Sequence, residues 1–136
     1  MLAYDHRTGE LERIPVDETC SGWMPRQQGG FAIAARSGLR LTDSDHDPGR
    51  PAVKIEADRP ANRSNDAKCD PAGRLWLGTM ADDETTGAGA LYRIDPGLDA
   101  TQVLTPISIS NGLGWSSDGS RMYYVDSPTR RVDVFD

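Results

Sequence analysis

The chain has 136 residues, 37% of them hydrophobic, and a formal net charge of −6 at pH 7. This length suggests one small domain, and the acidic balance argues against a nucleic-acid-binding surface, which needs clustered Lys and Arg to replace counterions. No apolar run approaches the ~18 residues of a membrane span, and the N-terminus lacks the basic and apolar stretches of a signal peptide. We therefore expect a cytoplasmic protein with no membrane contact.

Strand-like segments recur along the chain at a nearly constant spacing. A turn followed by a short apolar run appears three times, as RQQGGFAIAAR, DPAGRLWLGTM and SSDGSRMYYVDS. The turn glycines Gly30, Gly73 and Gly119 lie 43 and 46 residues apart. A second strand-like unit closes each repeat, at residues 39–43, 91–95 and 132–136, and residues 2–5 resemble the same unit of an earlier repeat. Short apolar runs bounded by turn residues are typical of β-strands.

The segments between these units complete the pattern. Residues 6–14 and 95–104 each have a glycine at a bend and predict hairpins. Residues 43–62 are polar and rich in proline, which predicts a long connection, and residues 81–90 predict a small loop. No segment has sustained helical periodicity.

An all-β chain that repeats in this way predicts the blades of a β-propeller, each a four-stranded sheet. At this period the chain holds about three blades, whereas propellers close with about 4–8. We therefore expect residues 1–136 to form one propeller domain truncated at both ends, either a fragment of a longer protein or a chain that needs a partner to close. Its oligomeric state is left open.

Three spaced aspartates, Asp43, Asp45 and Asp47, resemble the start of a calcium loop. In an EF-hand the sixth position is glycine and the twelfth is a bidentate glutamate. Here these positions hold Pro48 and Lys54, so we interpret the segment as a solvated acidic loop.

The histidines and cysteines also indicate no site by their spacing. His6 and His46 have no second ligand at a metal-binding distance in the sequence, and we expect both at the surface. Cys20 and Cys69 form no CxxC motif and are interpreted as buried or half-buried thiols. No GxSxG motif or phosphate-binding glycine loop is present.

The stretch NRSND, residues 62–66, concentrates hydrogen-bonding side chains immediately before a predicted strand. Arginine offers a rigid fork of donors, and an asparagine side chain both donates and accepts. In an extended segment Arg63 and Asn65 point to the same face. Spacing alone leaves two alternatives open, a structural loop and a site for an oxygen-rich ligand.

Asn111 is a second candidate, although an Asn-Gly pair is first a turn signal. Asn65 precedes Gly73 by the same number of residues as Asn111 precedes Gly119. Equivalent positions of successive blades surround one central axis in a propeller. The two asparagines are therefore predicted to converge.

NRSNDAKCDPAGRLWLGTM and ISNGLGWSSDGSRMYYVDSPTRRVDVFD resemble the SMP-30/gluconolactonase/LRE family of regucalcin-like sugar lactonases. The family pattern is close to N-R-x-N-D-x-x-x-D-P-x-G-R-x-x-x-G-T-M followed by S-N-G-[LI]-x-W-S-x-D. A weaker match covers nearly the whole chain, including LAYDHRTGELERI and EADRPANR.

The resemblance implies a partial six-bladed β-propeller and a sugar lactonase that depends on one divalent metal: calcium, zinc, manganese or magnesium. Asn111 would be a metal ligand, Arg63 and Asn65 would contact the sugar lactone, and Asp66 would support the site from nearby. Asp83 falls where the family commonly has a substrate-contacting glutamate. A metal that polarises the carbonyl of a lactone needs no serine nucleophile, which agrees with the missing motif.

The chain departs from the family pattern at both ends. The first metal ligand of the family, a glutamate, would precede Met1, and the aspartate that serves as ligand and general base would follow Asp136. One neutral amide does not hold a divalent cation against water. We therefore expect these 136 residues alone to be weakly stable and inactive. The alternatives are a non-catalytic binding module and an inactive truncated product.

Overall fold

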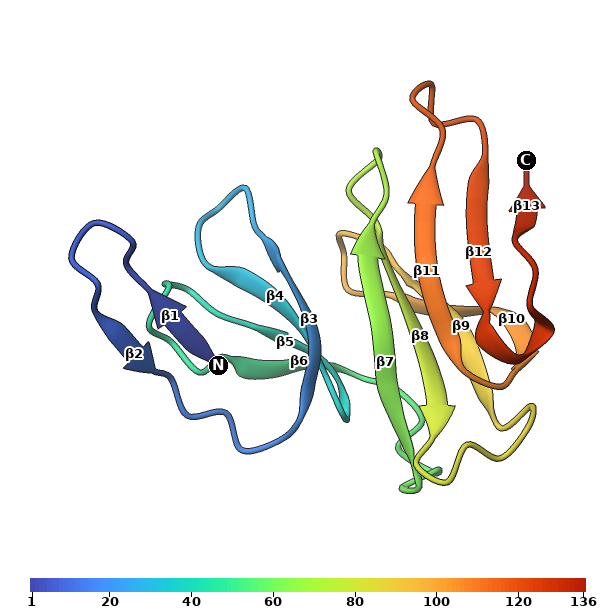
Figure 1. Cartoon of the computed structure of the whole chain (residues 1–136), viewed down its shortest axis with the longest axis horizontal. Coiled ribbons are helices and arrows are strands. Elements are labelled where there is room, and N and C mark those ends of the chain that lie inside the picture. Colours follow the sequence, from blue (N-terminus) through green and yellow to red (C-terminus); the bar gives the residue numbers. More distant parts are fainter.

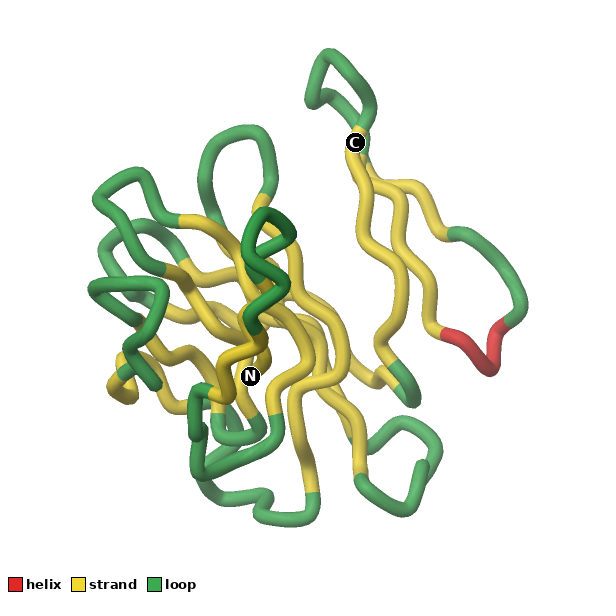
Figure 2. The backbone as a smooth tube through the Cα atoms, turned by 60° about the vertical axis from the view of Figure 1, so that its left-hand side comes forward, coloured by secondary structure: helices red, strands yellow, loops and turns green.

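A computed structural model describes residues 1–136, and every regular element but one is a β-strand. The exception is a short 3₁₀ helix, η1 (Ser127–Thr129), drawn red in Figure 2. No helix is long and apolar enough to cross a membrane.

The strands form four separate antiparallel sheets (Figure 1). The N-terminal hairpin consists of β1 (Leu2–Tyr4) and β2 (Leu11–Arg13). The first blade contains β3 (Cys20–Pro25), β4 (Phe31–Ala35), β5 (Gly38–Leu41) and β6 (Arg50–Lys54). The second blade contains β7 (Asn62–Cys69), β8 (Leu75–Ala81), β9 (Gly89–Ile94) and β10 (Ala100–Ile107). The third sheet contains β11 (Ser110–Trp115), β12 (Met122–Asp126) and β13 (Asp133–Phe135).

Strands that follow one another in the chain are neighbours within each sheet, as in the blades of a propeller. β7 contacts both β3 and β11 and lies between them in Figure 1. The first strands of the three sheets therefore lie next to one another, as the inner strands of propeller blades do. This arrangement confirms the prediction of an all-β, partial propeller.

Apolar side chains fill the space between adjacent sheets. One cluster joins the first and second blades and contains Ala34, Leu39, Ile55, Leu75, Leu77 and Ile94. A second cluster joins the second blade to the third sheet and contains Leu91, Ile107, Leu113 and Tyr124. The sheets are held face to face by this burial of apolar surface, which is worth about 25 cal/mol per Å².

The three turns at Gly30, Gly73 and Gly119 lie where the repeat predicts them, immediately before β4, β8 and β12. All three glycines have positive φ, at 66°, 78° and 71°, which glycine adopts without a steric cost. The closing units of the repeats correspond to β5, β9 and β13, and β1 is the closing unit of the earlier repeat.

The prediction of a connection over residues 43–62 was wrong in two respects. The segment contains β6, which pairs with β5, and Asn62 already begins β7. β6 is the last strand of its sheet, and an edge strand tolerates Pro51 and polar side chains because one side needs no ladder hydrogen bonds. Composition therefore did not distinguish this strand from a loop.

Candidate functional site

The first strand of each of the three larger sheets contains a β-bulge at a similar position. In β3 the pairing passes from Cys20 to Gly22, so Ser21 is the extra residue. In β7 the extra residue is Asn65, and in β11 it is Gly112. A bulge bends the strand and re-aims a side chain. Three neighbouring strands therefore share this irregularity at the place where polar residues collect.

The predicted site residues Arg63, Asn65 and Asn111 meet across the junction of β7 and β11. Nη1 of Arg63 donates to Oδ1 of Asn65 at 2.8 Å. Nδ2 of Asn65 donates to the carbonyl oxygen of Ser110 at 2.8 Å and lies 3.4 Å from Oδ1 of Asn111. The two asparagines converge, as their equal distance from the turn glycines predicts.

One end of the Arg63 guanidinium lacks a strong acceptor. Its Nη2 faces Sδ of Met80 at 3.2 Å, and a thioether is a weak acceptor. Its Nε lies 3.6 Å from Oδ1 of Asp82. Since the side chain is 31% exposed, it is accessible and retains donor capacity for a ligand oxygen.

Asp66 supports this junction rather than facing a ligand. Its Oδ1 accepts the backbone N–H of Ala67 at 2.9 Å, and its Oδ2 accepts the backbone N–H of Gly112 at 2.8 Å. Oδ2 therefore joins β7 to β11, and Oδ1 binds the next residue of its own strand. Its role as a supporting residue near a site stays a prediction.

Asp83 lies apart from the cluster. Its Oδ1 accepts hydrogen bonds from Oγ1 and the backbone N of Thr85, at 2.7 and 3.0 Å. The hydrogen bond from the Thr85 hydroxyl is the largest cause that lowers the pKa of Asp83, and the bond from the Thr85 backbone adds to it. The structure shows no hydrogen bond between Asp83 and the cluster, and its substrate contact stays a prediction.

Asp82 and Arg36 border the cluster, and sequence reasoning missed both. Arg36 belongs to the turn between β4 and β5 and forms an ion pair with Asp82, which follows β8. Hydrogen bonds from Arg36 hold the pKa of Asp82 below its usual range. The adjacent acidic pair Asp82-Asp83 was a weak signal, and Arg36 lies in no recognisable motif.

These residues surround a polar cavity of about 420 Å³ between the first and second blades. It is lined by Thr19, Cys20, Ser21, Arg36, Arg63, Ser64, Asn65 and Asp82. Ligand sites commonly occupy about 300–1,000 Å³, so a small molecule fits. The lining consists almost entirely of hydroxyl, amide and charged groups, which suits a ligand rich in oxygen.

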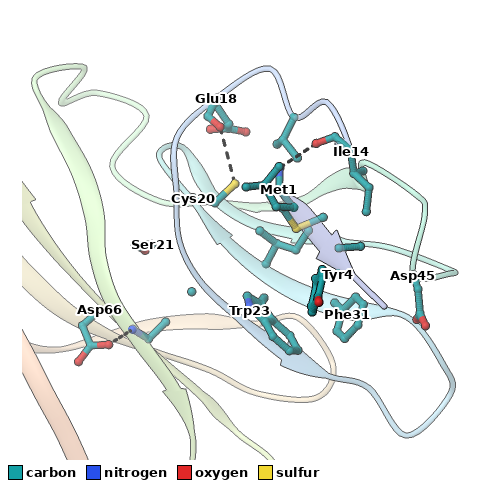
Figure 3. A pocket seen from close by; sticks show the side chains of 16 residues that line it. Met1, Tyr4, Ile14, Glu18, Cys20, Ser21, Trp23, Phe31, Asp45 and Asp66 are labelled. Atoms are coloured by element: carbon teal, nitrogen blue, oxygen red, sulfur yellow. Dashed lines mark hydrogen bonds between the residues drawn. The ribbon is translucent and has the colours of Figure 1, made fainter. Parts of the chain in front are cut away.

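A larger cavity of about 980 Å³ separates the N-terminal hairpin from the first blade. Trp23, Phe31 and Tyr4 gather in it, and Asp66 stands at its far side (Figure 3). Most of its lining is apolar. We assign the candidate site to the smaller cavity, because that one contains the Arg63–Asn65 pair.

The other predicted surface groups lie at the periphery. Nδ1 of His46 contacts Oε2 of Glu12 at 2.5 Å, with both side chains largely exposed. Oδ1 and Oδ2 of Asp47 accept the backbone N–H groups of Gly49 and Asp43 at 2.8 and 2.9 Å. These bonds organise the loop between β5 and β6.

The two cysteines are free thiols. Cys69 is half-buried, as predicted, whereas Cys20 is exposed. Burial nevertheless raises the pKa of both thiols, which disfavours the reactive thiolate form.

The side chains of this chain do not by themselves fit a divalent cation. No group of three His, Cys, Asp or Glu side chains gathers anywhere in it. Of the predicted ligand set only Asn111 is present, and its Nδ2 donates to Oγ of Ser127 at 3.0 Å. A single amide oxygen is too few, because calcium takes about 6–8 oxygen ligands.

Residues 1–136 match the protein family described as the SMP-30/Gluconolactonase/LRE-like region. The chain belongs to this family. Human regucalcin is 33% identical over 138 residues, which cover 98% of this chain and 46% of regucalcin. A protein of Sulfolobus acidocaldarius is 37% identical over 136 residues, which cover 93% of this chain and 49% of that protein. The chain thus spans about half the length of the curated relatives it matches.

Solved structures of this family superpose on nearly the whole chain. The regucalcin of Agrobacterium tumefaciens, described as a calcium-binding protein, matches with a TM-score of 0.90 and 30% identity, covering 99% of this chain and 46% of that one. A luciferin-regenerating enzyme matches with a TM-score of 0.86 and 32% identity, covering 99% and 48%. The arrangement of the four sheets is therefore the arrangement found in this family.

Proposed function

We propose that the complete protein carrying these residues hydrolyses a sugar lactone to the aldonic acid, with a divalent cation as cofactor. The observation that carries the proposal is the contact of Arg63, Asn65 and Asn111 beside a polar cavity of about 420 Å³. Membership of a family that includes gluconolactonases supports the same reaction class.

Arg63 and Asn65 would bind the hydroxyl and carbonyl oxygens of the lactone. The guanidinium has an end that faces only a thioether, and a donor placed at a developing oxyanion stabilises the transition state of acyl transfer. Asn65 keeps Arg63 in place through the 2.8 Å bond from Nη1. The site would therefore use fixed donors of this chain to orient the substrate.

Asn111 would contribute one oxygen ligand to the cation. The remaining cation ligands would come from outside residues 1–136, because no group of three His, Cys, Asp or Glu side chains inside them could hold a metal ion. The general base would be the aspartate that the family pattern places after Asp136. The relative described as calcium-binding supports a divalent cation, and oxygen ligands suit several hard cations.

A non-catalytic binding module is the second candidate, favoured by Asp83, a shorter carboxylate than the glutamate of the family pattern, which is hydrogen-bonded to Thr85 rather than to the cluster. In such a protein Arg63 and Asn65 would bind an oxygen-rich ligand without hydrolysing it. Both candidate functions predict that the site binds an oxygen-rich ligand, and only the lactonase predicts that the ligand is hydrolysed.

The test is hydrolysis of glucono-δ-lactone by the complete protein, with and without a chelator. Arg63→Lys keeps the charge but loses the fork of donors, and we expect kcat/KM to fall by about 10²-fold. Arg131→Lys, which alters an exposed ion pair with Asp133 on β13, is the matched control. Gluconate binding without turnover would favour the binding module. Chelator-sensitive turnover by the 136-residue chain alone would contradict the need for outside ligands.

A further inference from the structure

Asp82 lies between two guanidinium groups that come from different blades. Arg36, in the first blade, donates through Nη1 to Oδ1 of Asp82 at 3.0 Å and through Nη2 to its Oδ2. Arg63, in the second blade, has its Nε 3.6 Å from the same Oδ1. One carboxylate is therefore shared between an arginine of the neighbouring blade and the arginine of the candidate site.

The pair of Arg36 and Asp82 is also tied to the backbone that leads into β7. Nη2 of Arg36 donates to the carbonyl oxygen of Pro60 at 3.1 Å, and the backbone N–H of Asp82 donates to the carbonyl oxygen of Ala61 at 2.9 Å. A bidentate arginine–carboxylate pair has a defined geometry. The backbone contacts at Pro60 and Ala61 therefore fix the position of the Arg36–Asp82 pair relative to Arg63, the second residue of β7.

We propose that Arg36 and Asp82 are positioning residues for Arg63: Arg36 orients the Asp82 carboxylate, and this carboxylate holds Nε of Arg63 so that Nη1 stays on Asn65 and the guanidinium lines the cavity. The effect on catalysis rests on the proposed function. The contacts that position Arg63 do not depend on it.

The charges of the three side chains agree with this role. Two guanidinium groups share one carboxylate, so the cluster keeps one net positive charge for an oxygen-rich or anionic ligand. The hydrogen bonds from Arg36 lower the pKa of Asp82, and the carboxylate accordingly stays ionised at neutral pH. A simpler role, an ion pair that only joins two blades, predicts different behaviour when the charges are exchanged.

The test compares three changes in the complete protein: Asp82→Asn, Arg36→Gln, and the exchange Arg36→Asp with Asp82→Arg. The exchange recreates an ion pair between the blades but places a cation beside Arg63. Arg131→Gln, in an exposed pair on the third sheet, is the control. The readouts are the Nε–Hε NMR signal of Arg63, the thermal midpoint, and KM and kcat for glucono-δ-lactone.

We expect Asp82→Asn and Arg36→Gln to shift and broaden the Arg63 signal and to raise KM by about tenfold or more. The exchange should restore the thermal midpoint lost in the single variants and leave KM high. Restoration of both the midpoint and KM would overturn the proposal, as would an unchanged Arg63 signal in Asp82→Asn. If the signal responds as expected while the wild type hydrolyses no lactone, the positioning role stands and the proposed function fails.

Discussion

The carboxylate of Asp66 in β7 accepts a hydrogen bond from the backbone N–H of Gly112 in β11, with 2.8 Å between Oδ2 and N. Gly112 is the extra residue of its bulge and has a φ of +70°. It also follows Asn111 directly, so a side chain of the second blade sets the backbone beside a proposed ligand of the third sheet. The geometry of the site thus depends on contacts between blades.

Replacing Asp66 by asparagine should loosen this junction. The carboxylate accepts the N–H groups of Ala67 and Gly112 with separate oxygens, whereas an amide has one oxygen and would turn its NH₂ toward the other donor. We expect Asp66→Asn to lower the free energy of unfolding by about 1–2 kcal/mol, measured by urea denaturation. Asp58→Asn, at an exposed position, should change it by less than about 0.5 kcal/mol, and equal effects of the two changes would contradict the role of Asp66.

Gly78 in β8 has no room for a side chain. A Cβ there would lie 1.7 Å from Oγ and 2.3 Å from Cβ of Ser110, which is fully buried. We expect Gly78→Ala to destabilise the protein by about 1–3 kcal/mol or more, because β8 and β11 would be forced apart. Thermal denaturation measures the effect.

Two further variants show whether the contact with Ser110 is the cause. Adding Ser110→Gly removes both clashing atoms and should recover most of the loss, less about 0.5–1 kcal/mol for a glycine within a strand. Gly114→Ala, where no atom lies within 4 Å of the added Cβ, should be nearly neutral. No recovery in the double variant would rule out this explanation.

The hydroxyl of Tyr124 should be dispensable at neutral pH. The ring is fully buried, and its Oη has no partner in hydrogen-bond geometry, although the hydroxyl of Ser110 lies close enough to lower its pKa. Tyr124→Phe keeps the packing and removes the unsatisfied group, so the free energy of unfolding should stay the same or rise by up to about 1 kcal/mol. A large loss at pH 7 would show that the hydroxyl contributes to folding.

The same variant should differ from the wild type in alkali. Burial raises the pKa of Tyr124 to about 12, above the value of about 10 in an unfolded chain. Ionisation of Tyr124 is therefore less favourable in the folded chain than in the unfolded one. The stability that depends on a neutral phenol is fully present below pH 10 and is lost as the pH rises toward 12. Urea midpoints between pH 9 and 11.5 should fall less steeply for Tyr124→Phe. Equal slopes would contradict the raised pKa.

Asp118, in the turn between β11 and β12, should contribute to stability only above acidic pH. Its Oδ1 accepts hydrogen bonds from Oγ of Ser116 at 2.6 Å and from the backbone N and Oγ of Ser120 at 3.1 and 2.9 Å. The bond from Ser116 is the largest cause that lowers the pKa of Asp118 to about 2. Since the unfolded value is about 3.9, the contribution is present above pH 4 and is lost as the pH falls to about 2.

Asp118→Asn should accordingly show a shallower loss of stability between pH 4 and 2 than the wild type, measured by urea denaturation at several pH values. A slope of Asp118→Asn identical to that of the wild type would mean that the turn does not hold the carboxylate in solution.

Most strands could be predicted because each is marked locally. The units around Gly30, Gly73 and Gly119 correspond to β4, β8 and β12, since tight turns need residues that tolerate positive φ. β6 was missed because an edge strand has a polar composition with proline. The bulges at Asn65 and Gly112 leave no mark in the sequence, and they are visible only in the pairing of strands.

The sequence by itself determined the all-β class, the repeat, and the convergence of Asn65 and Asn111, because equal distances from a turn residue place side chains at equivalent points of successive blades. Only the tertiary structure decided what surrounds Arg63. Asp82 reaches it from the end of β8, and Arg36 reaches Asp82 from a turn of the first blade. Contacts between blades depend on how the sheets pack against one another, and that packing is set by the buried clusters between them rather than by any local sequence pattern.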